Sequence, residues 1–364
     1  MITPNVVKAD DKTGFTNNKL IKHFGSTPIN NDLLNRIKKI CRVDYLHPLL
    51  SRGMVFSHRD LDKFLDDIEQ GKKVYIYTGR GPSTSRMHLG HLVPFMLTKY
   101  LQDLFKCDVY IQITDDEKYL LKGKHSLGEY TAMGHENIKD IIACGFDMER
   151  TFIFVDTEVM SNENKFYVNL IKIMKNLTCN QVRACFDIKD GDNLGKMFFP
   201  ALQMVPAFAT TFGMDKNVRC LIPCGIDQDP YFRLVRDVAK KMKSKKPAVI
   251  HTNFLPSLKG RDEKMSASDE SSAIYLDDTP KKIKKKINKA FSGGRETTEL
   301  HKKLGGVPEI DVAFQYLKCF MESDKALREI EDKYRKGEMS TGELKKICCE
   351  IICNIVDEHK QNLK

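Results

Sequence analysis

The sequence predicts an α/β fold, with a Rossmann-like domain built on a parallel sheet followed by a C-terminal domain of helices only. Two observations lead to this prediction. From about residue 72 to residue 279, short apolar runs that suit strands alternate with longer stretches of helical periodicity. After Thr279 the strand-like runs almost disappear, and helical stretches follow one another, separated by turns that contain glycine. Alternation of strand and helix implies right-handed crossovers and a parallel sheet covered by helices on both faces.

The expected strands are short runs of aromatic and aliphatic residues, which fit a sheet that is buried on both faces. They cover residues 74–77, 109–113, 152–155, 220–223 and 248–250. The helices of the same region are expected where apolar residues recur every three or four positions. They cover residues 89–105, 135–144, 164–175 and 231–242.

The two ends of the chain differ from this middle part. Residues 1–55 are polar and irregular apart from one expected helix at 31–42, and we interpret them as an N-terminal extension. The helices expected after Thr279 cover residues 280–291, 312–321, 324–334 and 342–357. The sequence therefore predicts three parts, which are residues 1–55, a sheet domain at 56–279 and a helical domain at 280–364.

The composition is that of an ordinary soluble globular protein, with 41% hydrophobic and 30% charged residues in a chain of 364. No apolar run reaches the length of a membrane span, and the polar N-terminus lacks the pattern of a secretory signal. The 11 cysteines are scattered, without a Cys-x-x-Cys pair. We expect them to be reduced core thiols of a cytoplasmic protein rather than disulfides or zinc ligands, and we expect no membrane partner.

The formal net charge of +10 suggests a polyanionic partner. Part of this charge is concentrated in a lysine-rich run at 281–289, where Ile283 and Ile287 form a narrow apolar seam. Such a run is either a solvated helix face or a contact to a phosphate backbone, and the sequence leaves both interpretations open.

The first motif that carries chemistry is a glycine-rich turn, TGRGP at 78–82, which leads into HLGH at 88–91. Its glycines let the backbone pass close to a nucleotide, and the start of the following helix favours an anionic phosphate. His88 and His91 lie on one face of the first helical turn, so both imidazoles can donate hydrogen bonds to one phosphate. Gly90 leaves room for a flat base. The motif is neither a P-loop nor a dinucleotide fingerprint, and capping or zinc binding are the other interpretations of the histidines.

The second motif is KMSAS at residues 264–268, in a polar and charge-rich segment after Gly260. A lysine on such a segment can stabilise the charge that develops on pyrophosphate as it leaves, and the serines add hydroxyl donors. Either motif alone is a weak signal. Together, in this order, they predict a site that transfers a nucleotide.

Polar residues also follow two other expected strands. Ligands of parallel sheets bind at the carboxyl ends of the strands, so the loops after Tyr77, Ile113 and Pro223 are expected to converge. The loop after Pro223 contains Asp227, which could accept hydrogen bonds from a ribose. The loop after Ile113 contains the acidic run 115–117, which could bind a divalent metal. We favour the alternative, in which these acids form hydrogen bonds or cap the next helix.

These motifs resemble those of a known family. TGRGP with HLGH, then IQITDDEKYL, CLIPCGIDQDPYF and KMSAS, are similar to the HIGH and KMSKS signatures of class I aminoacyl-tRNA synthetases, in the form typical of eukaryotic cytoplasmic tryptophanyl-tRNA synthetases. The resemblance covers about residues 72 to 350. It implies a ligase that converts L-tryptophan and ATP to tryptophanyl-adenylate and transfers the product to the 3′ end of tRNA(Trp). It also implies a cytoplasmic homodimer in which ATP carries the Mg²⁺, with no prosthetic group and no metal held by the protein.

The resemblance assigns roles to residues of this sequence. Catalysis would fall to His88, His91, Lys264, Ser266 and Ser268. ATP would be held by Arg80, Gly81, Thr84, Gly90, Gly225, Asp227 and Met265. The indole N–H of tryptophan would be held by Tyr77 and Gln112, and its charged end by Glu117, Gln203 and Gln228. The anticodon-binding residues of the helical domain would be Arg295, Glu296 and Lys345.

A site with matched acceptors for the one indole donor rejects phenylalanine, which leaves those acceptors unsatisfied. Three other functions remain open, namely tyrosyl specificity on the same fold, nucleotidyl transfer to a small molecule, and a catalytically silent tRNA-binding protein. The basic helical domain favours a tRNA substrate over a small molecule. The intact His88, His91 and Lys264 favour an active enzyme.

Overall fold

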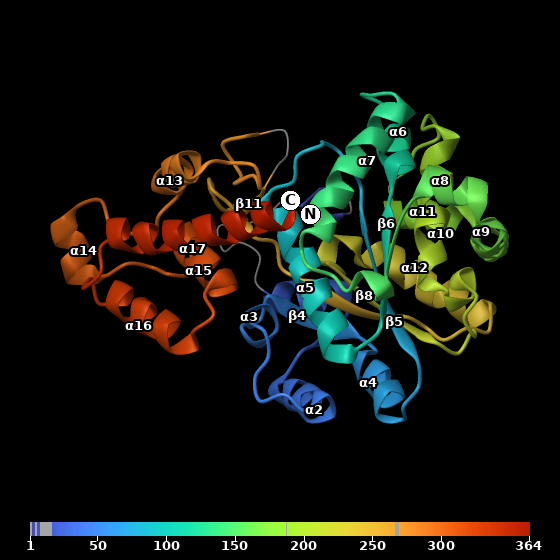
Figure 1. Ribbon diagram of the computed structural model, residues 1–364, viewed down its shortest axis with the longest axis horizontal. Helices are drawn as coiled ribbons and strands as arrows, with labels where there is room; N and C mark the ends of the chain where they lie inside the picture. The colour runs from blue at the N-terminus through green and yellow to red at the C-terminus, as the bar shows by residue number, and fades with distance from the viewer. Residues whose placement is uncertain (1, 4–5, 8–16, 187, 266–268) are drawn as a thin grey trace.

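The fold is centred on a seven-stranded sheet. The computed structural model describes residues 2–3, 6–7, 17–186, 188–265 and 269–364. The strand order is β3-β4-β9-β8-β5-β6-β7, and Figure 1 shows helices on both sides of the sheet. The strands are β3 (Thr27–Pro28), β4 (Val55–Arg59), β5 (Val74–Arg80), β6 (Asp108–Ile113), β7 (Thr151–Val155), β8 (Arg219–Gly225) and β9 (Ala248–Thr252). All five strands expected from the sequence are present, and they pair in parallel, as predicted.

Alternation along the central strands divides the core between the two faces of the sheet. In β5, Val74 and Ile76 face one side, while Tyr75 and Tyr77 face the other. The first side is covered by α5 (Leu89–Phe105), whose buried apolar residues join the same core. The second side is covered by α9 (Asn164–Asn176), α11 (Leu194–Met204) and α12 (Asp229–Lys241). Because β5 lies between β6 and β8, its carboxyl end is supported by strands on both sides.

The sheet extends beyond the expected strands at one edge. β3 lies within the predicted N-terminal extension and β4 begins at its last residue, and β4 pairs antiparallel with both β3 and β9. β4 contains two buried polar residues, Ser57 and His58, and for this reason a pattern of hydrophobic residues does not predict it as a strand. The Ser57 hydroxyl lies 2.9 Å from Nδ1 of His251 on β9, so this polar group is satisfied inside the sheet.

Several helices differ from the sequence prediction. α2 (Asn31–Cys41) is present as expected, whereas α7 (Leu127–Ile142) begins well before residue 135 because Ser126 and Glu129 form a capping box. Helices that the sequence prediction lacks are α1 (Asn17–Phe24), α3 (Pro48–Ser51), α4 (Leu61–Glu69), α6 (Asp115–Lys122), α8 (Asp156–Asn162), α10 (Cys179–Phe186), α11 and α14 (Thr298–Leu304). The short strands form two further pairs, β1 (Ile2–Thr3) with β2 (Val6–Val7) and β10 (Pro256–Ser257) with β11 (Gly260–Lys264).

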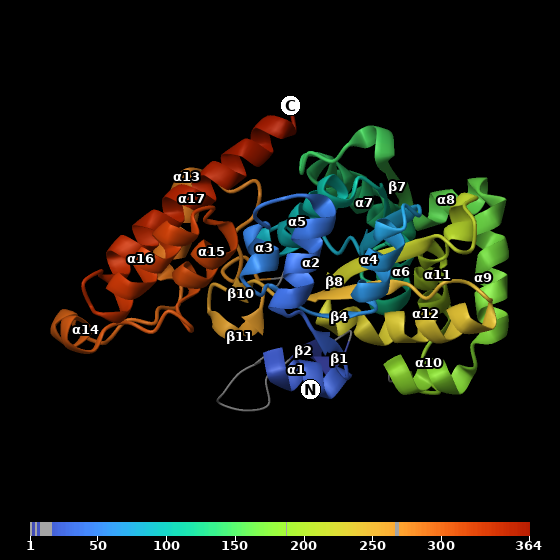
Figure 2. The ribbon, with the colours of Figure 1, turned by 90° about the horizontal axis from the view of Figure 1, so that it is seen from below.

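Residues 280–364, all of which are described, contain helices and no strand. These helices are α13 (Pro280–Lys289), α14, α15 (Val312–Phe320), α16 (Asp324–Arg335) and α17 (Thr341–Asn362). The four helices expected from the sequence are all among them, and Figure 2 shows the group on one side of the sheet domain. Within the described ranges of the whole chain, no helix is long and apolar enough to cross a membrane.

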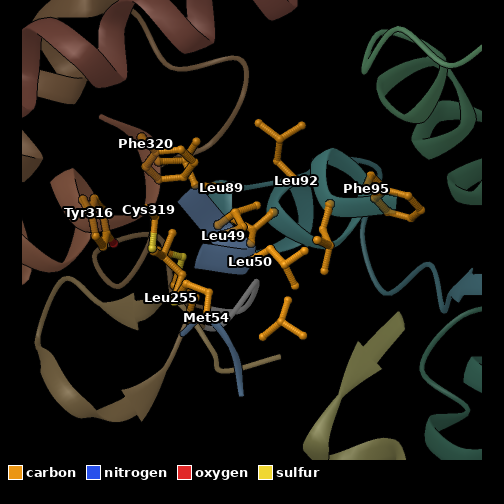
Figure 3. Packing of buried hydrophobic residues seen from close by; sticks show 14 of the residues in the cluster. Leu49, Leu50, Met54, Leu89, Leu92, Phe95, Leu255, Tyr316, Cys319 and Phe320 are labelled. Atoms are coloured by element: carbon orange, nitrogen blue, oxygen red, sulfur yellow. The ribbon is translucent and has the colours of Figure 1, made fainter. Parts of the chain in front are cut away.

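The helical region shares a hydrophobic core with the sheet domain. Figure 3 shows Tyr316, Cys319 and Phe320 of α15 beside Leu49 of α3 and Leu255, which follows β9. All five residues are buried in one continuous cluster. The division of the chain near residue 280 stays a prediction, because the core continues across it.

The end of α17 reaches back to α7 of the sheet domain, as Figures 1 and 2 show. His359 Nε2 lies 2.9 Å from Asp140 Oδ1 on α7. The side-chain amide of Asn362 donates to the carbonyl oxygen of Ala143 at 3.0 Å. The last turn of α17 is therefore attached to a helix that also borders the predicted nucleotide site.

Candidate active site

A cavity of about 380 Å³ opens at the carboxyl ends of β5, β6 and β8. It is the place where the sequence predicts that three loops converge. The expected substrate-binding residues that line it are Tyr77, Arg80, Gly81, Gly90, His91, Gln112, Glu117, Gln203, Gly225, Asp227 and Gln228. The predicted convergence of the loops is therefore confirmed, while the role of each side chain stays a prediction.

The two histidines of HLGH lie at the N-terminus of α5. His88 is the N-cap residue, and its backbone N–H lies 3.4 Å from Nδ1 of His91. The two rings stack, with centroids 3.5 Å apart and planes 21° from parallel. His91 lines the cavity, whereas His88 is 2% exposed and does not. The imidazole placed to meet a phosphate is therefore that of His91, with the His88 ring packed against it.

Gly90 allows the KMSAS segment to approach the HLGH motif. A Cβ atom at Gly90 would lie 3.1 Å from Met265 Sδ and 3.1 Å from His88 Cε1, which is closer than side chains normally pack. Met265 is buried, and it does not line the cavity. His88 also forms an isolated antiparallel bridge with Tyr275, which follows the KMSAS segment. The two motifs, far apart in the sequence, are thus in direct contact.

The rest of KMSAS is only partly described. Lys264 is the last residue of β11 and lies opposite Pro256 of β10. The Lys264 side chain, and all of Ser266 and Ser268, lie outside what the structure describes. The catalytic roles expected for these three residues stay predictions.

Arg80, the last residue of β5, is half-buried and brings a positive charge to the cavity, with its Nη2 atom buried. Its Nε donates to Oδ1 of Asn137 on α7 at 3.1 Å, while Nη2 has no hydrogen-bond partner among the described residues. Burial lowers the pKa of the guanidinium to about 10, which leaves it protonated at neutral pH. A cation with a buried, unused donor favours an anionic ligand. Thr84 does not line the cavity. Its hydroxyl donates to the carbonyl oxygen of Arg86 at 2.8 Å, a hydrogen bond within the loop.

Tyr77 and Gln112, on adjacent strands, belong to one chain of hydrogen bonds. Tyr77 Oη lies 2.5 Å from Gln112 Oε1 and 2.8 Å from the carbonyl oxygen of Gln203. Nε2 of Gln112 donates to both carboxylate oxygens of Asp156, at 2.8 and 3.0 Å. Gln203 in turn donates to Oε1 of Gln228 at 3.3 Å. Four of the residues expected to hold tryptophan, Tyr77, Gln112, Gln203 and Gln228, are therefore linked to one another, whereas Glu117 pairs with Lys118. Asp156 is a further member of the chain that the sequence prediction lacks.

Two glycines let carboxylates approach the wall of the cavity. Oε1 of Glu117 lies 2.6 Å from Nζ of Lys118, and a Cβ atom at Gly81 would lie only 2.2 Å from the other carboxylate oxygen. On β8, a Cβ atom at Gly225 would lie 2.6 Å from Oδ1 of Asp227. Neither position has room for a side chain while these carboxylates keep their places.

The acidic run that opens α6 is used for hydrogen bonds within the protein. Asp115 accepts from the hydroxyls of Thr131 and Thr157, both at 2.7 Å. Asp116 Oδ1 accepts from the backbone N–H of Glu117 at 2.7 Å. In the part of the chain that the structure describes, no group of three or more His, Cys, Asp or Glu residues could hold a metal ion. Of the two interpretations of this run, the structure shows the hydrogen-bonding one.

The half-buried Asp116 and the fully buried Asp156 are neighbouring carboxyl groups whose ionisation costs stability. Burial, and then the nearby Asp115, raises the pKa of Asp116 to about 7, and burial and Asp116 raise the pKa of Asp156 well above its usual range. The contribution of such a group to stability is fully present below its unfolded pKa of about 4 and is lost as the pH rises through the folded pKa. The free energy of unfolding of Asp116→Asn should therefore exceed that of wild type by on the order of 2 kcal/mol near pH 8, and should differ little near pH 4.5.

Urea denaturation of wild type and Asp116→Asn at the two pH values measures this difference in unfolding free energy. Asp190→Asn is the control, because the Asp190 side chain is 93% exposed, and its effect should be small at both pH values. An equal gain for Asp116→Asn under the two conditions would contradict the raised pKa.

The residues expected to meet an anticodon differ in their surroundings. Arg295 and Glu296 are exposed in the segment between α13 and α14. Lys345, which the resemblance gives as an anticodon-binding residue, is 8% exposed and donates to the carbonyl oxygens of Asn288 and Ala290, at 3.0 and 2.7 Å. A lysine at this place satisfies the last carbonyls of α13. The structure therefore gives Lys345 a role inside the helical region.

The architecture and the two contacting motifs are those of a class I tRNA synthetase. The family model described as tRNA synthetases class I (W and Y) matches residues 69–356, and the chain belongs to this family. The cytoplasmic tryptophan–tRNA ligase of Rattus norvegicus is 48% identical over 368 residues, covering 100% of this chain and 76% of that protein. Within the family, the chain is therefore a member of the tryptophan–tRNA ligases.

The chain is also similar to solved structures of tryptophanyl-tRNA synthetases. The tryptophanyl-tRNA synthetase of Giardia lamblia has a TM-score of 0.90 to this chain at 43% identity, covering 95% of this chain and 92% of that one. The enzyme of Encephalitozoon cuniculi, solved bound to tryptophan, has a TM-score of 0.85 at 38% identity, with 96% of both chains covered. These similarities extend over the sheet domain and the helical region together.

Proposed function

We propose that this chain activates L-tryptophan with ATP to tryptophanyl-adenylate and transfers the tryptophanyl group to the 3′ end of tRNA(Trp). The observation that carries the proposal is a single cavity in which the indole acceptors Tyr77 and Gln112 lie together with Arg80 and His91. The tryptophan in the Encephalitozoon cuniculi structure supports the choice of amino acid. The relative from Rattus norvegicus is named cytoplasmic, which supports the cytoplasm as the place of action.

The amino-acid subsite is built from the hydrogen-bonded chain around Tyr77. Tyr77 and Gln112 accept the indole N–H, and Glu117, Gln203 and Gln228 hold the charged end of tryptophan. Phenylalanine would leave the two acceptors unsatisfied in a closed site, at a cost of about 1–3 kcal/mol for each buried group. Burial, then the nearby Asp156, raises the pKa of Tyr77 well above its usual range, so the phenol stays neutral at physiological pH.

The nucleotide subsite lies at the start of α5. Arg80 and His91 contact the phosphates, and His88 supports the ring of His91. Gly81, Gly90 and Gly225 leave space at the cavity wall, and Asp227 accepts from the ribose hydroxyls. Mg²⁺ enters as part of the substrate, bound to ATP. Thr84 and Met265 act through the loop and the packing that hold these residues in place.

The reaction needs positioning and electrostatic stabilisation rather than a covalent enzyme intermediate. The tryptophan carboxylate attacks the α-phosphorus in line, a new P–O bond forms, and the bond to pyrophosphate breaks. Lys264, assisted by Ser266 and Ser268, stabilises the negative charge on the leaving group. A hydroxyl of the terminal tRNA ribose then attacks the carbonyl carbon of the adenylate, an ester bond forms, and AMP and a proton are released.

The helical region is the proposed tRNA-binding part. Arg295 and Glu296 face solvent where an anticodon can reach them. The apolar seam of α13, Ile283 and Ile287, is buried as expected, and this leaves a row of lysines at the surface. The exposed lysines of this helix are Lys281, Lys284, Lys285 and Lys289. They suit a phosphate backbone, whose binding would weaken steeply with salt.

We also propose a homodimer, formed through the edge of the sheet at β7. A hollow of about 750 Å³ lies along this edge and is lined by Ile142, Met148 and Phe152, which are 41, 48 and 48% exposed. The neighbouring α9 exposes Tyr167 and Ile171 as well. An edge strand flanked by exposed apolar side chains is a surface that a second copy can cover.

Phe152→Glu should convert the dimer to a monomer, because it places a charge on the most exposed part of the β7 edge. Sedimentation equilibrium of wild type and variant measures the assembly state. Leu304→Glu is the control, since Leu304 is 56% exposed but lies in the helical region. A variant that still sediments as a dimer would place the interface elsewhere.

ATP–pyrophosphate exchange with tryptophan, tyrosine or phenylalanine tests the proposed function. Exchange with tryptophan alone is expected. Exchange with tyrosine would keep the reaction and overturn the assignment of the amino-acid subsite. No exchange by folded protein with any of the three would instead indicate a silent tRNA-binding protein or another acceptor.

A further inference from the structure

We propose that Asp156 is a positioning residue for amino-acid specificity, which fixes the side-chain amide of Gln112 so that the site presents acceptors to an N–H donor. The inference rests on the proposed function, because it concerns the amino acid bound at Tyr77 and Gln112. Asp156 does not line the cavity, and it acts through Gln112.

The fold places Asp156 directly behind Gln112. β6 and β7 pair in parallel, with Gln112 opposite Phe154, and Asp156 follows at the start of α8. The Asp156 side chain is fully buried, and its two oxygens lie 2.8 and 3.0 Å from Gln112 Nε2. The amide nitrogen of a glutamine can only donate and its oxygen can only accept, so the carboxylate selects one orientation of the amide.

A proton on one Asp156 oxygen does not change this orientation. Nε2 of Gln112 lies within hydrogen-bond distance of both Asp156 oxygens, so the oxygen without the proton still accepts from it. The amide oxygen of Gln112 points away from Asp156, toward Tyr77.

The orientation of Gln112 decides what Tyr77 can offer to a ligand. A phenol has one proton, and the neighbours of Tyr77 Oη are two acceptors, Gln112 Oε1 at 2.5 Å and the Gln203 carbonyl oxygen at 2.8 Å. The proton is therefore used within the protein, and the lone pairs of Tyr77 Oη remain for a donor in the cavity. If the amide of Gln112 turned over, its NH₂ group would donate to Tyr77 and occupy those lone pairs. Whether the subsite offers hydrogen-bond acceptors to a ligand N–H thus depends on Asp156.

The test compares tryptophan with 3-benzothienylalanine, in which sulfur replaces the indole N–H. The quantity measured is the ratio of kcat/KM values for the two amino acids in ATP–pyrophosphate exchange. Wild type should favour tryptophan by about 100-fold or more, because the analogue leaves the acceptors unsatisfied. In Asp156→Ala this preference should fall at least tenfold, mainly through a higher KM for tryptophan, with the analogue affected much less.

Two further variants separate this role from a general loss of structure. Asp156→Asn keeps one acceptor oxygen and should recover part of the preference. Asp115→Ala is the matched control, because Asp115 is equally buried in the same cluster but hydrogen-bonds Thr131 and Thr157 and not Gln112. It should keep the wild-type preference even if it lowers stability. If Asp156→Ala does not fold, Asp156→Asn alone tests the inference. Its preference for tryptophan over the analogue should be severalfold lower than that of wild type.

An unchanged preference for tryptophan in folded Asp156→Ala, or in Asp156→Asn if only that variant folds, overturns the inference. A wild-type enzyme that uses both amino acids equally also overturns it, because no N–H is then recognised. If the wild-type protein catalyses exchange with neither amino acid, the result contradicts the proposed function itself.

Discussion

Replacing Lys264 with alanine should slow tryptophan-dependent ATP–pyrophosphate exchange by about 10²- to 10³-fold in kcat. Lys264 ends β11, and the next residue, Met265, is buried against Gly90 at the start of α5. This packing brings the backbone of Lys264 close to the HLGH motif, where the proposed function has the charge on the leaving pyrophosphate develop. A contribution that is made only in the transition state lowers kcat and leaves ground-state binding intact.

Tryptophan binding to the same variant should change by less than about twofold. The chain contains no tryptophan, so the fluorescence of the bound amino acid can be followed without an indole background from the protein. Lys259→Ala is the control, because Lys259 lies in the same segment and its ammonium pairs with Asp269 at 2.6 Å. If Lys264→Ala kept exchange within tenfold of wild type, the catalytic assignment of this lysine would be wrong.

Arg59→Met should lower the free energy of unfolding by about 3–5 kcal/mol, because it leaves a buried carboxylate without its cation. Arg59 binds Asp229 with two hydrogen bonds of 2.7 and 2.8 Å, and the Asp229 side chain is fully buried. Burial alone would raise the pKa of Asp229, but hydrogen bonds from His251 and Arg59 outweigh it and hold the pKa below its usual range. The carboxylate is therefore charged in the folded protein.

Urea denaturation measures this loss, with Arg36→Met as the control. Arg36 also pairs with two carboxylates, Asp66 and Glu69, but those side chains are 49 and 45% exposed. An exposed pair contributes about 1 kcal/mol or less. Equal losses in the two variants would show that Asp229 does not depend on Arg59 for its stability.

The same variant should also weaken tryptophan binding. Asp229 directly follows Gln228 and begins α12, and Arg59 donates to the carbonyl oxygens of Phe24 and Gly25 as well. One side chain of β4 therefore connects α1 to the segment that carries Gln228. This contact explains how residues that the sequence assigns to an irregular N-terminal part support the amino-acid subsite.

The parallel sheet could be predicted because its strands are buried on both faces and read as continuous apolar runs. β4 could not be predicted in this way, since Ser57, His58 and Arg59 make it look polar. The polar groups of Ser57 and Arg59 are satisfied by His251 and Asp229, which are distant in the sequence. Hydrophobic patterns do not contain such partners, and this is why the edge of the sheet was missed.

Local signals exist for one helix whose start differs from the prediction and for one helix that the prediction lacks. Ser126 and Glu129 have the spacing of a capping box and mark the true start of α7. The residues Leu61, Phe64 and Leu65 form a buried apolar stripe on α4 at helical spacing. The capping box therefore predicts the start of α7, and the apolar periodicity predicts α4.

Most of the cavity could be predicted from the rule that ligands bind where parallel strands end. The rule predicts a ligand site after Tyr77, Ile113 and Pro223, and the cavity lies there. The same rule applied after Val155 would have pointed to Asp156, which was missed because a single acidic residue carries no motif. The burial of Lys345 could not be predicted, because it depends on how α17 packs against α13.

The attachment of α17 to α7 has a mechanical consequence. A helix of 22 residues is a stiff rod of about 33 Å, and a tilt of about 5° moves its tip by roughly 3 Å. The contact between His359 and Asp140 breaks over such a displacement unless α7 moves with it. α7 also carries Asn137, whose oxygen holds Arg80 at the cavity. A force that tilts the outer helices therefore also acts on the position of the Arg80 guanidinium at the cavity.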